Sequence, residues 1–431
     1  MRRVFCNLAF AITITGVMLV SSIQPASAAS IDEKLDRLEK LLQQQQQQIE
    51  SQSRTIEQLE NKLEKMTTSA PAATGTAGQQ MTQSDKPTVQ SGNEKVSVKL
   101  YGQLNRGVLL VDDGDSTNTY QVDNDNSSTR VGLLGSVNTI KNWEIGTKFE
   151  VEFESNSSSP VSQEDQNGVG GDSFNERWAD IFVNSPYGKL SLGQGDTASN
   201  NTSEIDLSGT TVAGYSDPNS QAGGHFFYDN ETKSLDLNTR IKDVFSNLDG
   251  LSRDDRIRYD TPDWRGLKLA TSAISGDGGD VALFYTYKSD SFKLAAGAAY
   301  SNPGSTSSSI DETMNGSVSL LHSSGFNLTV AGGVRELKDS QRDDPTFFYT
   351  KLGYKNTFCK LGETAMSIDF GINEDVDLDG DEAQIFSAQL VQYLSPWATD
   401  FYLTYRNYEL DRSGTDFENI HAVLSGLRVK F

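Results

Sequence analysis

The sequence is poor in cysteine and histidine, and this shortage limits the chemistry that it can perform. Its 431 residues include two cysteines and three histidines. Cys6 lies near the amino terminus, which leaves Cys359 alone in the rest of the chain and excludes a disulfide framework. The histidines are scattered, and no Ser/His/Asp arrangement, zinc-ligand spacing or phosphate-binding loop accompanies them. We therefore expect no enzyme activity, no cofactor and no metal site.

Long hydrophobic runs are lacking as well. After the amino terminus, no apolar run approaches the roughly 20 residues that a membrane-spanning helix needs. Hydrophobic residues make up 36% of the chain and the formal net charge is −22; this acidity argues against nucleic acid as a partner. A transmembrane β-barrel is still compatible with these numbers, because its strands alternate in polarity and give a fainter hydropathy signal than a helix does.

The first 28 residues have the features of a secretory signal peptide. Arg2 and Arg3 supply positive charge, residues 8–20 form an apolar core, and Ala26-Ser-Ala28 provides a cleavage site of small residues. The apolar core is too short for a membrane anchor. We therefore expect an exported protein.

Residues 31–66 carry an unbroken heptad pattern that predicts a coiled coil on the order of 50 Å long. Its predicted core contains Leu35, Leu38, Leu42, Ile49, Ile56, Leu59 and Leu63. The glutamine tract 43–48 also allows a solvated helix or a disordered segment, and the pattern does not decide between a dimer and a trimer. Residues 67–95, rich in Thr, Ser, Ala, Gly, Pro and Gln, are predicted to form a flexible linker.

From residue 96 onward, short alternating segments are separated by turn residues, which predicts strands. We place them near 96–111, 128–138, 142–154, 176–184, 188–195, 254–260, 266–274, 280–288, 291–300, 314–322, 326–334, 346–354, 361–371, 382–394, 398–408 and 420–431. These are sixteen strands, an even number, as a closed antiparallel barrel requires.

The connections between these strands alternate between short and long. Residues 185–188 and 395–397, for example, are tight turns, whereas 112–127, 155–175 and 196–253 are long and mostly acidic. Tight periplasmic turns and longer external loops produce this alternation in an outer-membrane barrel, and a soluble β-sandwich has no reason to show it. The predicted fold is therefore an all-β transmembrane barrel of 16 strands over 96–431, preceded by a periplasmic α-helical coiled coil.

The polarity of the strands supports a wet interior. Apolar residues of 401–405 face opposite to Thr404 and Arg406, and in the last strand Val429 and Phe431 face opposite to Arg428 and Lys430. One face suits lipid, and the other is too polar for a packed core. Phe431 is then the outward-facing end of a strand that must pair with the first one.

The longest connection, 196–253, is too long for an ordinary surface loop, and long loops are usually functional or disordered. Apolar residues such as Phe226 and Phe245 punctuate it, as a loop folded against the barrel wall requires; a mobile external loop is the alternative. Folded inward, it would narrow the pore and oppose charges across a constriction. Candidates are Glu204, Asp206 and Asp217 on the loop and Arg130, Arg177, Arg256 and Arg258 on the wall. The arginines could instead merely pair with nearby acids. Arg177 shares the parity of Ala179, Ile181 and Val183, so it points inward only if those residues do too, or if a bulge intervenes.

Several segments resemble the trimeric general porins of Gram-negative bacteria. They are Leu100-Tyr-Gly-Gln-Leu-Asn-Arg-Gly107, Ser128-Thr-Arg-Val-Gly-Leu133, Asn175-Glu-Arg-Trp-Ala-Asp180, Tyr187-Gly-Lys-Leu-Ser-Leu-Gly-Gln194 and Arg256-Ile-Arg-Tyr-Asp-Thr-Pro262. The resemblance implies a homotrimer in the outer membrane, in contact with lipid and lipopolysaccharide and inserted by the barrel-assembly machinery, with Phe431 as the assembly signal.

The same resemblance implies a third loop folded into the lumen opposite arginines. Arg130 and Arg177 match the wall arginines, Arg256 or Arg258 would supply a third, and Gln103 lies where some members carry a lysine. The loop of this chain is longer and its acids align poorly. The amino-terminal coiled coil is not part of the ordinary porin and is similar to the helical extension of some substrate-preferring porins.

The sequence therefore predicts a water-filled channel for passive diffusion of small hydrophilic solutes and ions. The alternatives are a channel that prefers an anion, dicarboxylate, phosphate or sugar, and an envelope-tethering protein whose barrel is an anchor. Asp375-Val-Asp377-Leu-Asp379-Gly380 matches the first half of a calcium loop, but Phe386 occupies the position of the bidentate glutamate. A solvated acidic loop is favoured there, with incidental binding of a divalent cation left open.

Overall fold

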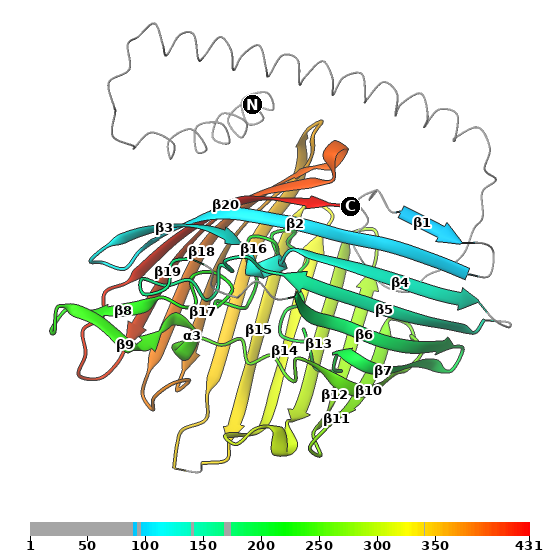
Figure 1. Ribbon diagram of the computed structural model, residues 1–431, viewed down its shortest axis with the longest axis horizontal. Coiled ribbons are helices and arrows are strands. Elements are labelled where there is room, and N and C mark those ends of the chain that lie inside the picture. Colours follow the sequence, from blue (N-terminus) through cyan, green and yellow to red (C-terminus); the bar gives the residue numbers. More distant parts are fainter. Residues whose placement is uncertain (1–88, 93–95, 139–141, 168–173, 340) are drawn as a thin grey trace, which may run out of the picture. The chain divides into compact units, whose positions relative to one another are not determined.

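The computed structural model describes residues 89–92, 96–138, 142–167, 174–339 and 341–431 (Figure 1). The predicted signal peptide, the predicted coiled coil with all its core residues, and most of the predicted linker lie outside these residues. Within the described part, no helix is long and apolar enough to span a membrane.

Sixteen strands of the described chain close into an antiparallel ring, in which each strand pairs with its neighbours along the ring and the last pairs with the first. The strands are β2 (Val96–Asp112), β4 (Arg130–Asn138), β5 (Glu144–Phe153), β6 (Phe174–Ser185), β7 (Gly188–Asp196), β10 (Arg253–Asp260), β11 (Leu267–Ile274), β12 (Gly279–Lys288), β13 (Phe292–Asn302), β14 (Ile310–His322), β15 (Phe326–Leu337), β16 (Thr346–Cys359), β17 (Gly362–Glu374), β18 (Glu382–Leu394), β19 (Thr399–Asp411) and β20 (Ile420–Lys430). The predicted number and order of strands are confirmed.

The two faces of the wall differ as the alternation predicts. Along β10, for instance, Ile257 and Tyr259 point outward and are exposed, whereas Arg256 and Asp260, which flank this pair, are buried. The same contrast holds in β16, where exposed Leu352 follows buried Lys351. An apolar outer band with a polar interior is the arrangement that a barrel needs in lipid.

The remaining elements belong to connections, and sequence patterns did not indicate them. They are β1 (Val89–Gly92), β3 (Thr117–Asp123), η1 (Asp125–Ser127), the hairpin of β8 (Phe226–Asp229) and β9 (Ser234–Arg240), α3 (Ile241–Val244), η2 (Gly304–Thr306) and η3 (Ser395–Trp397). β3 pairs with the outer half of β2. The β8–β9 hairpin and α3 lie within the connection 197–252, which we call the long loop (Figure 1).

The barrel closes at the end of the chain. The amide of Phe431 donates to the carbonyl of Gly102 at 3.0 Å, and the amide of Gly102 donates to the carbonyl of Phe431 at 2.9 Å. The aromatic ring lies over Gly102, since a Cβ added there would be 2.6 Å from ring carbons of Phe431. Only glycine therefore leaves room for the terminal ring at this seam.

Candidate functional site

The long loop lies against the inner face of the barrel wall. The amides of Ile205 and Leu207 donate to the hydroxyls of Ser317 at 3.0 Å and Ser319 at 2.9 Å, on β14. Five strands further round the ring, Thr404 of β19 donates its hydroxyl to the carbonyl of Ala213 at 2.7 Å. All three wall residues are lumen-facing and buried. The loop thus follows the inner wall from β14 to β19 and occupies that half of the lumen.

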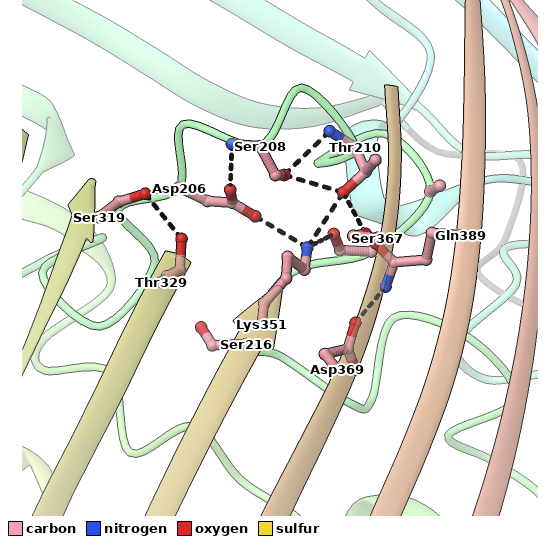
Figure 2. Close-up of polar contacts among 12 residues, drawn as sticks. Asp206, Ser208, Thr210, Ser216, Ser319, Thr329, Lys351, Ser367, Asp369 and Gln389 are labelled. Atoms are coloured by element: carbon pink, nitrogen blue, oxygen red, sulfur yellow. Dashed lines mark hydrogen bonds and ion pairs between the residues drawn. The ribbon is translucent and has the colours of Figure 1, made fainter. Parts of the chain in front are cut away.

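A buried ion pair fixes the first third of the long loop to β16 (Figure 2). The Lys351 ammonium lies 2.8 Å from the Asp206 carboxylate, and the two side chains are 0% and 2% exposed. Lys351 also donates to the carbonyl of Gly214 at 2.7 Å and to the Thr210 hydroxyl at 3.3 Å. Burial alone would raise the pKa of Asp206, but the ammonium and the hydrogen bonds from Ser208 hold it below its usual value. The pair is therefore charged and fully engaged.

Hydrogen bonds extend this anchor to the neighbouring strands. The Thr210 hydroxyl is 2.8 Å from that of Ser367 on β17, which donates to the side-chain carbonyl of Gln389 on β18 at 3.0 Å. Gln389 in turn donates to Asp369 at 2.6 Å (Figure 2). The polar groups that the loop buries in this region are satisfied by the wall, as the burial of polar atoms requires.

A second cation holds the next segment of the loop. The guanidinium of Arg406, on β19, donates to the carbonyls of Pro218 at 2.9 Å and Asp217 at 3.3 Å. Tyr408, two residues further along the strand, donates its hydroxyl to the same Pro218 carbonyl at 3.0 Å. Arg406 is 1% exposed. It acts here as a clamp on the loop backbone and does not face open water.

Two of the predicted constriction arginines hold the base of the loop. Arg256 forms an ion pair with Asp180 at 2.9 Å, and both side chains are 1% exposed. Arg258 pairs with Asp260 at 2.8 Å and donates to the Thr197 carbonyl at 2.6 Å. Neither arginine lines the cavity described below. Arg256 and Arg258 thus pair with nearby acids, which was the simpler of the two interpretations.

The first external loop also reaches into the lumen, through η1. Gln103 donates its side-chain amide to the carbonyls of Ser127 and Ser128, each at 2.8 Å. Arg428 of β20 donates to the Ser127 hydroxyl at 2.9 Å. Gln103 is itself buried. The structure therefore places this predicted pore residue behind η1, where it positions the turn and does not line the cavity described below.

A cavity of about 570 Å³ lies between η1, the long loop and the wall. Its charged and polar lining combines the wall residues Arg130, Glu152, Arg177 and Arg253, the η1 residues Asp125, Asn126 and Ser127, and the loop residues Glu204, Thr211, Tyr215, Asp217, Ser220 and Asp249. Arginines come from the wall, and most carboxylates come from the loops. Of the predicted residues, Arg130, Arg177, Glu204 and Asp217 meet here, whereas Asp206, Gln103, Arg256 and Arg258 serve as supports.

Arg177 reaches the cavity because of a β-bulge. Glu150 of β5 pairs with Trp178 and Val151 pairs with Glu176, so that Arg177 is the extra residue on β6. A bulge places two residues opposite one and changes the parity of the strand. Arg177 consequently points inward and binds Glu150 at 2.9 Å and Glu152.

The charges of the cavity are unevenly balanced. Arg177 is neutralised by two glutamates, but Arg130 forms no ion pair with any described residue, and its guanidinium lies 3.3 Å from the Ser127 hydroxyl. On the loop side, burial and then the neighbouring Asp249 raise the pKa of Glu204 well above its usual value. Burial likewise raises the pKa of Asp249. These two carboxyls therefore hold protons more readily than free acids do.

The calcium-like segment is occupied by arginines of neighbouring loops. Arg412 contacts Asp377 at 2.7 Å and Asp381 at 2.6 Å, and Arg342 contacts Asp379 at 3.1 Å. Across the residues that the structure describes, no group of three or more His, Cys, Asp or Glu side chains is arranged to hold a metal ion. The acids of this loop tie the outer loops together.

Sequence reasoning missed Lys351 and the η1 residues. Lys351 shares the inward face of its strand with Tyr349 and Gly353, and the alternation of inward and outward residues could have identified it as facing the lumen. Its partner Asp206 is 145 residues away, however, and no local pattern connects the two. The sequence around η1 gives a weaker indication, because its inward turn depends on contacts with Gln103 and Arg428, which are distant in sequence.

Comparisons with known proteins agree with this architecture. A family model described as Gram-negative porin matches residues 67–413. No curated protein matches the chain. Among solved structures, an anion-selective porin from Comamonas acidovorans shares 16% identity with a TM-score of 0.51, covering 78% of this chain and 100% of that one. The outer-membrane-expressed OmpT of Vibrio cholerae (10% identity, TM-score 0.51, 80% and 100% covered) and Salmonella typhi OmpF in complex with daunomycin (13%, 0.51, 80% and 100%) are also similar. At these identities the structural likeness concerns the fold.

Proposed function

The chain belongs to the Gram-negative porin family, and from this premise we propose that the cavity between η1, the long loop and the wall is the constriction of its pore. As a porin, the protein forms an outer-membrane channel for passive diffusion of small hydrophilic solutes. The constriction then decides which of them pass.

One observation carries the proposal. The long loop is hydrogen-bonded to lumen-facing residues from β14 to β19 and occupies that half of the barrel. Solutes must therefore pass on the other side, along Arg130 and Arg177. The cavity on that side, of about 570 Å³, has arginines on the wall and carboxyls on the loop. Opposed rings or rows of charge filter solutes without binding them tightly.

We propose weak selectivity for this constriction, because both signs of charge line it. Three arginines face five carboxyl groups in the cavity lining, but Glu152 is paired with Arg177 and the raised pKa values of Glu204 and Asp249 reduce their charge. Removing one member of either set should shift the balance. Arg130→Gln is expected to favour cations and Asp217→Asn to favour anions.

The experiment is reconstitution of the full chain into planar lipid bilayers. We expect stepwise conductance, a small reversal potential in a salt gradient, and opposite displacements of that potential in the two variants. Arg342→Gln, which changes an external arginine outside the cavity, is a matched control. Protein that inserts but gives no stepwise conductance would overturn the proposal.

An anion-preferring channel is the second candidate. Arg130 is a cavity arginine without a carboxylate partner among the described residues, and the chain is similar in fold to a porin named for its anion selectivity. The sign of the reversal potential in wild-type protein separates this candidate from the weakly selective pore. Competition by phosphate, dicarboxylates or sugars tests a narrower substrate preference.

We further propose that the protein is a homotrimer whose segment 31–66 forms a coiled coil in the periplasm. The heptad pattern and the porin resemblance support this assembly, as does an apolar outer face that suits lipid or a neighbouring barrel. Contacts with lipopolysaccharide and with the barrel-assembly machinery belong to the same proposal. Deleting 31–66 distinguishes a tether from a trimerisation segment: loss of envelope attachment with normal permeability would support the tethering function instead.

A further inference from the structure

A second cavity lies at the opposite end of the barrel from the long external loops. Its volume is about 520 Å³, and it is formed by the turns that join β12 to β13 and β14 to β15 together with the adjoining ends of β16 and β17. Short turns face the periplasm in barrels of this kind. The cavity therefore opens at the periplasmic mouth, and we call it the lysine groove after Lys288, Lys293 and Lys355, which line it.

Two of its lysines face the lumen directly opposite each other. Lys288 on β12 and Lys293 on β13 are partners in the strand register. Lys288 shares the face of buried Asp280 and Ala282, and Lys293 shares that of buried Ser301. Both side chains are exposed in the groove. Like charges directly opposite each other destabilise a pair of strands, so this arrangement gains nothing for the fold.

Neither of these two ammonium groups is neutralised. No hydrogen bond or ion pair joins Lys288 or Lys293 to any residue in the described part of the chain. The other charges of the groove are placed differently. Lys355 contacts Glu363 at 3.6 Å, Asp290 occupies the exposed turn between the two strands, and the His322 ring is engaged with the Ser324 hydroxyl.

We propose that the lysine groove is a binding site for small dianions, with Lys288 and Lys293 each engaging one end of the anion. The chemical class is a compact solute with two acid oxygens on separate sides, such as hydrogen phosphate or a short dicarboxylate. An ammonium group is a compact charge with three donors on a flexible stem, which suits such oxygens. The inference rests on the proposed channel, because the solute reaches the groove through the pore mouth.

The position of the groove gives the site a role separate from that of the constriction. Arg130 and Arg177 lie in the cavity under the external loops, whereas the lysines lie at the periplasmic end of β12 and β13. A cluster of one sign in a water-filled cleft raises the local concentration of the opposite ion. The groove therefore retains dianions at one end of the channel and makes their effect on the current depend on the side of addition.

The test is the chloride current of the full-length channel in planar bilayers at about pH 8, with hydrogen phosphate or succinate added to one compartment at a time. We expect saturable block that is stronger from one side. In Lys288→Gln/Lys293→Gln, the half-blocking concentration should rise about tenfold. Lys99→Gln removes a charge from an exposed lumen-facing lysine of β2 outside the groove, and it should leave the block unchanged. Comparing the half-blocking concentrations of phosphate and succinate shows which dianion the groove binds better.

Three results would overturn the site. Block that is equal from both sides contradicts its position, and block that is unchanged in the double lysine variant contradicts its residues. If the half-blocking concentration rises as much in Lys99→Gln as in the single variants Lys288→Gln and Lys293→Gln, the block depends on the overall positive charge of the pore mouth and not on this site. In each case the unitary conductance shows that the variant has folded. Absence of any stepwise conductance would instead refute the proposed channel.

Discussion

Replacing Lys351 by methionine is expected to loosen the first third of the long loop without unfolding the barrel. The change removes the partner of Asp206, which is 2% exposed, together with the donor to the Gly214 carbonyl. Removing one member of a buried ion pair costs about 3–5 kcal/mol, because the other charge is left uncompensated. The barrel strands and the Arg406 clamp are untouched, so the cost falls on local opening of the loop.

Hydrogen exchange measures that opening directly. The amides of Ile205 and Leu207 are protected by Ser317 and Ser319 and flank Asp206. A loss of about 3–5 kcal/mol in local stability corresponds to exchange that is faster by a factor on the order of 10²–10⁴. We expect this acceleration at these two amides and noisier single-channel currents, with the exchange of wall amides unchanged.

A double variant makes the reasoning falsifiable. Replacing both partners of a buried ion pair by apolar residues is often neutral, so Lys351→Met/Asp206→Leu should restore most of the protection. Lys355→Met, four residues along the same strand, removes a half-buried lysine with only a loose partner and serves as the control. Unchanged exchange at Ile205 and Leu207 in the single variant would refute the anchoring role, as would a double variant no better protected than the single one.

Three further predictions concern pH and closure of the barrel. Burial, and then the nearby Asp125, raise the pKa of Glu154 to about 9. Raising the pH through that value adds negative charge beside the cavity, so the selectivity for cations should increase. Reversal potentials measure this increase, and Glu154→Gln should abolish it. Gly102→Ala places a methyl group against the Phe431 ring and should lower the yield of inserted barrels, measured by heat-modifiable gel mobility; Gly135→Ala, with its nearest neighbour at 3.3 Å, should not. Truncating Phe431 should reduce insertion in the same assay while surviving channels keep normal conductance; an altered conductance would contradict a role limited to assembly.

The strands could be predicted from the sequence because their determinants are local. Alternating polarity and turn residues act over a few positions, and lipid outside with water inside imposes the same alternation on every strand. The observed ends differ by a few residues, as with β14, which begins at Ile310 where we predicted 314. The added residues continue the ladder with β15, so the pairing partner set this boundary.

The site was predicted less completely because its geometry depends on distant partners. Strand parity placed Arg130 in the lumen, but Arg177 needed the bulge opposite Glu150 and Val151, which has no clear local signature. Asp206 and Glu204 are two residues apart, and both carry a carboxyl group. Only the position of Lys351 on β16 makes one of them an anchor and leaves the other beside the cavity.

The residues that hold the long loop and those that line the cavity form separate sets. Lys351 and Arg406, on β16 and β19, grip the loop, whereas Arg130 and Arg177, on β4 and β6, face the cavity. A mutation of Arg130 or Arg177 can therefore alter the charge of the passage without releasing the loop. A mutation of Lys351 or Arg406 can alter the width of the passage without altering the charge of its lining. Such a channel can evolve, or be redesigned, toward new solutes in single steps that each keep the barrel intact.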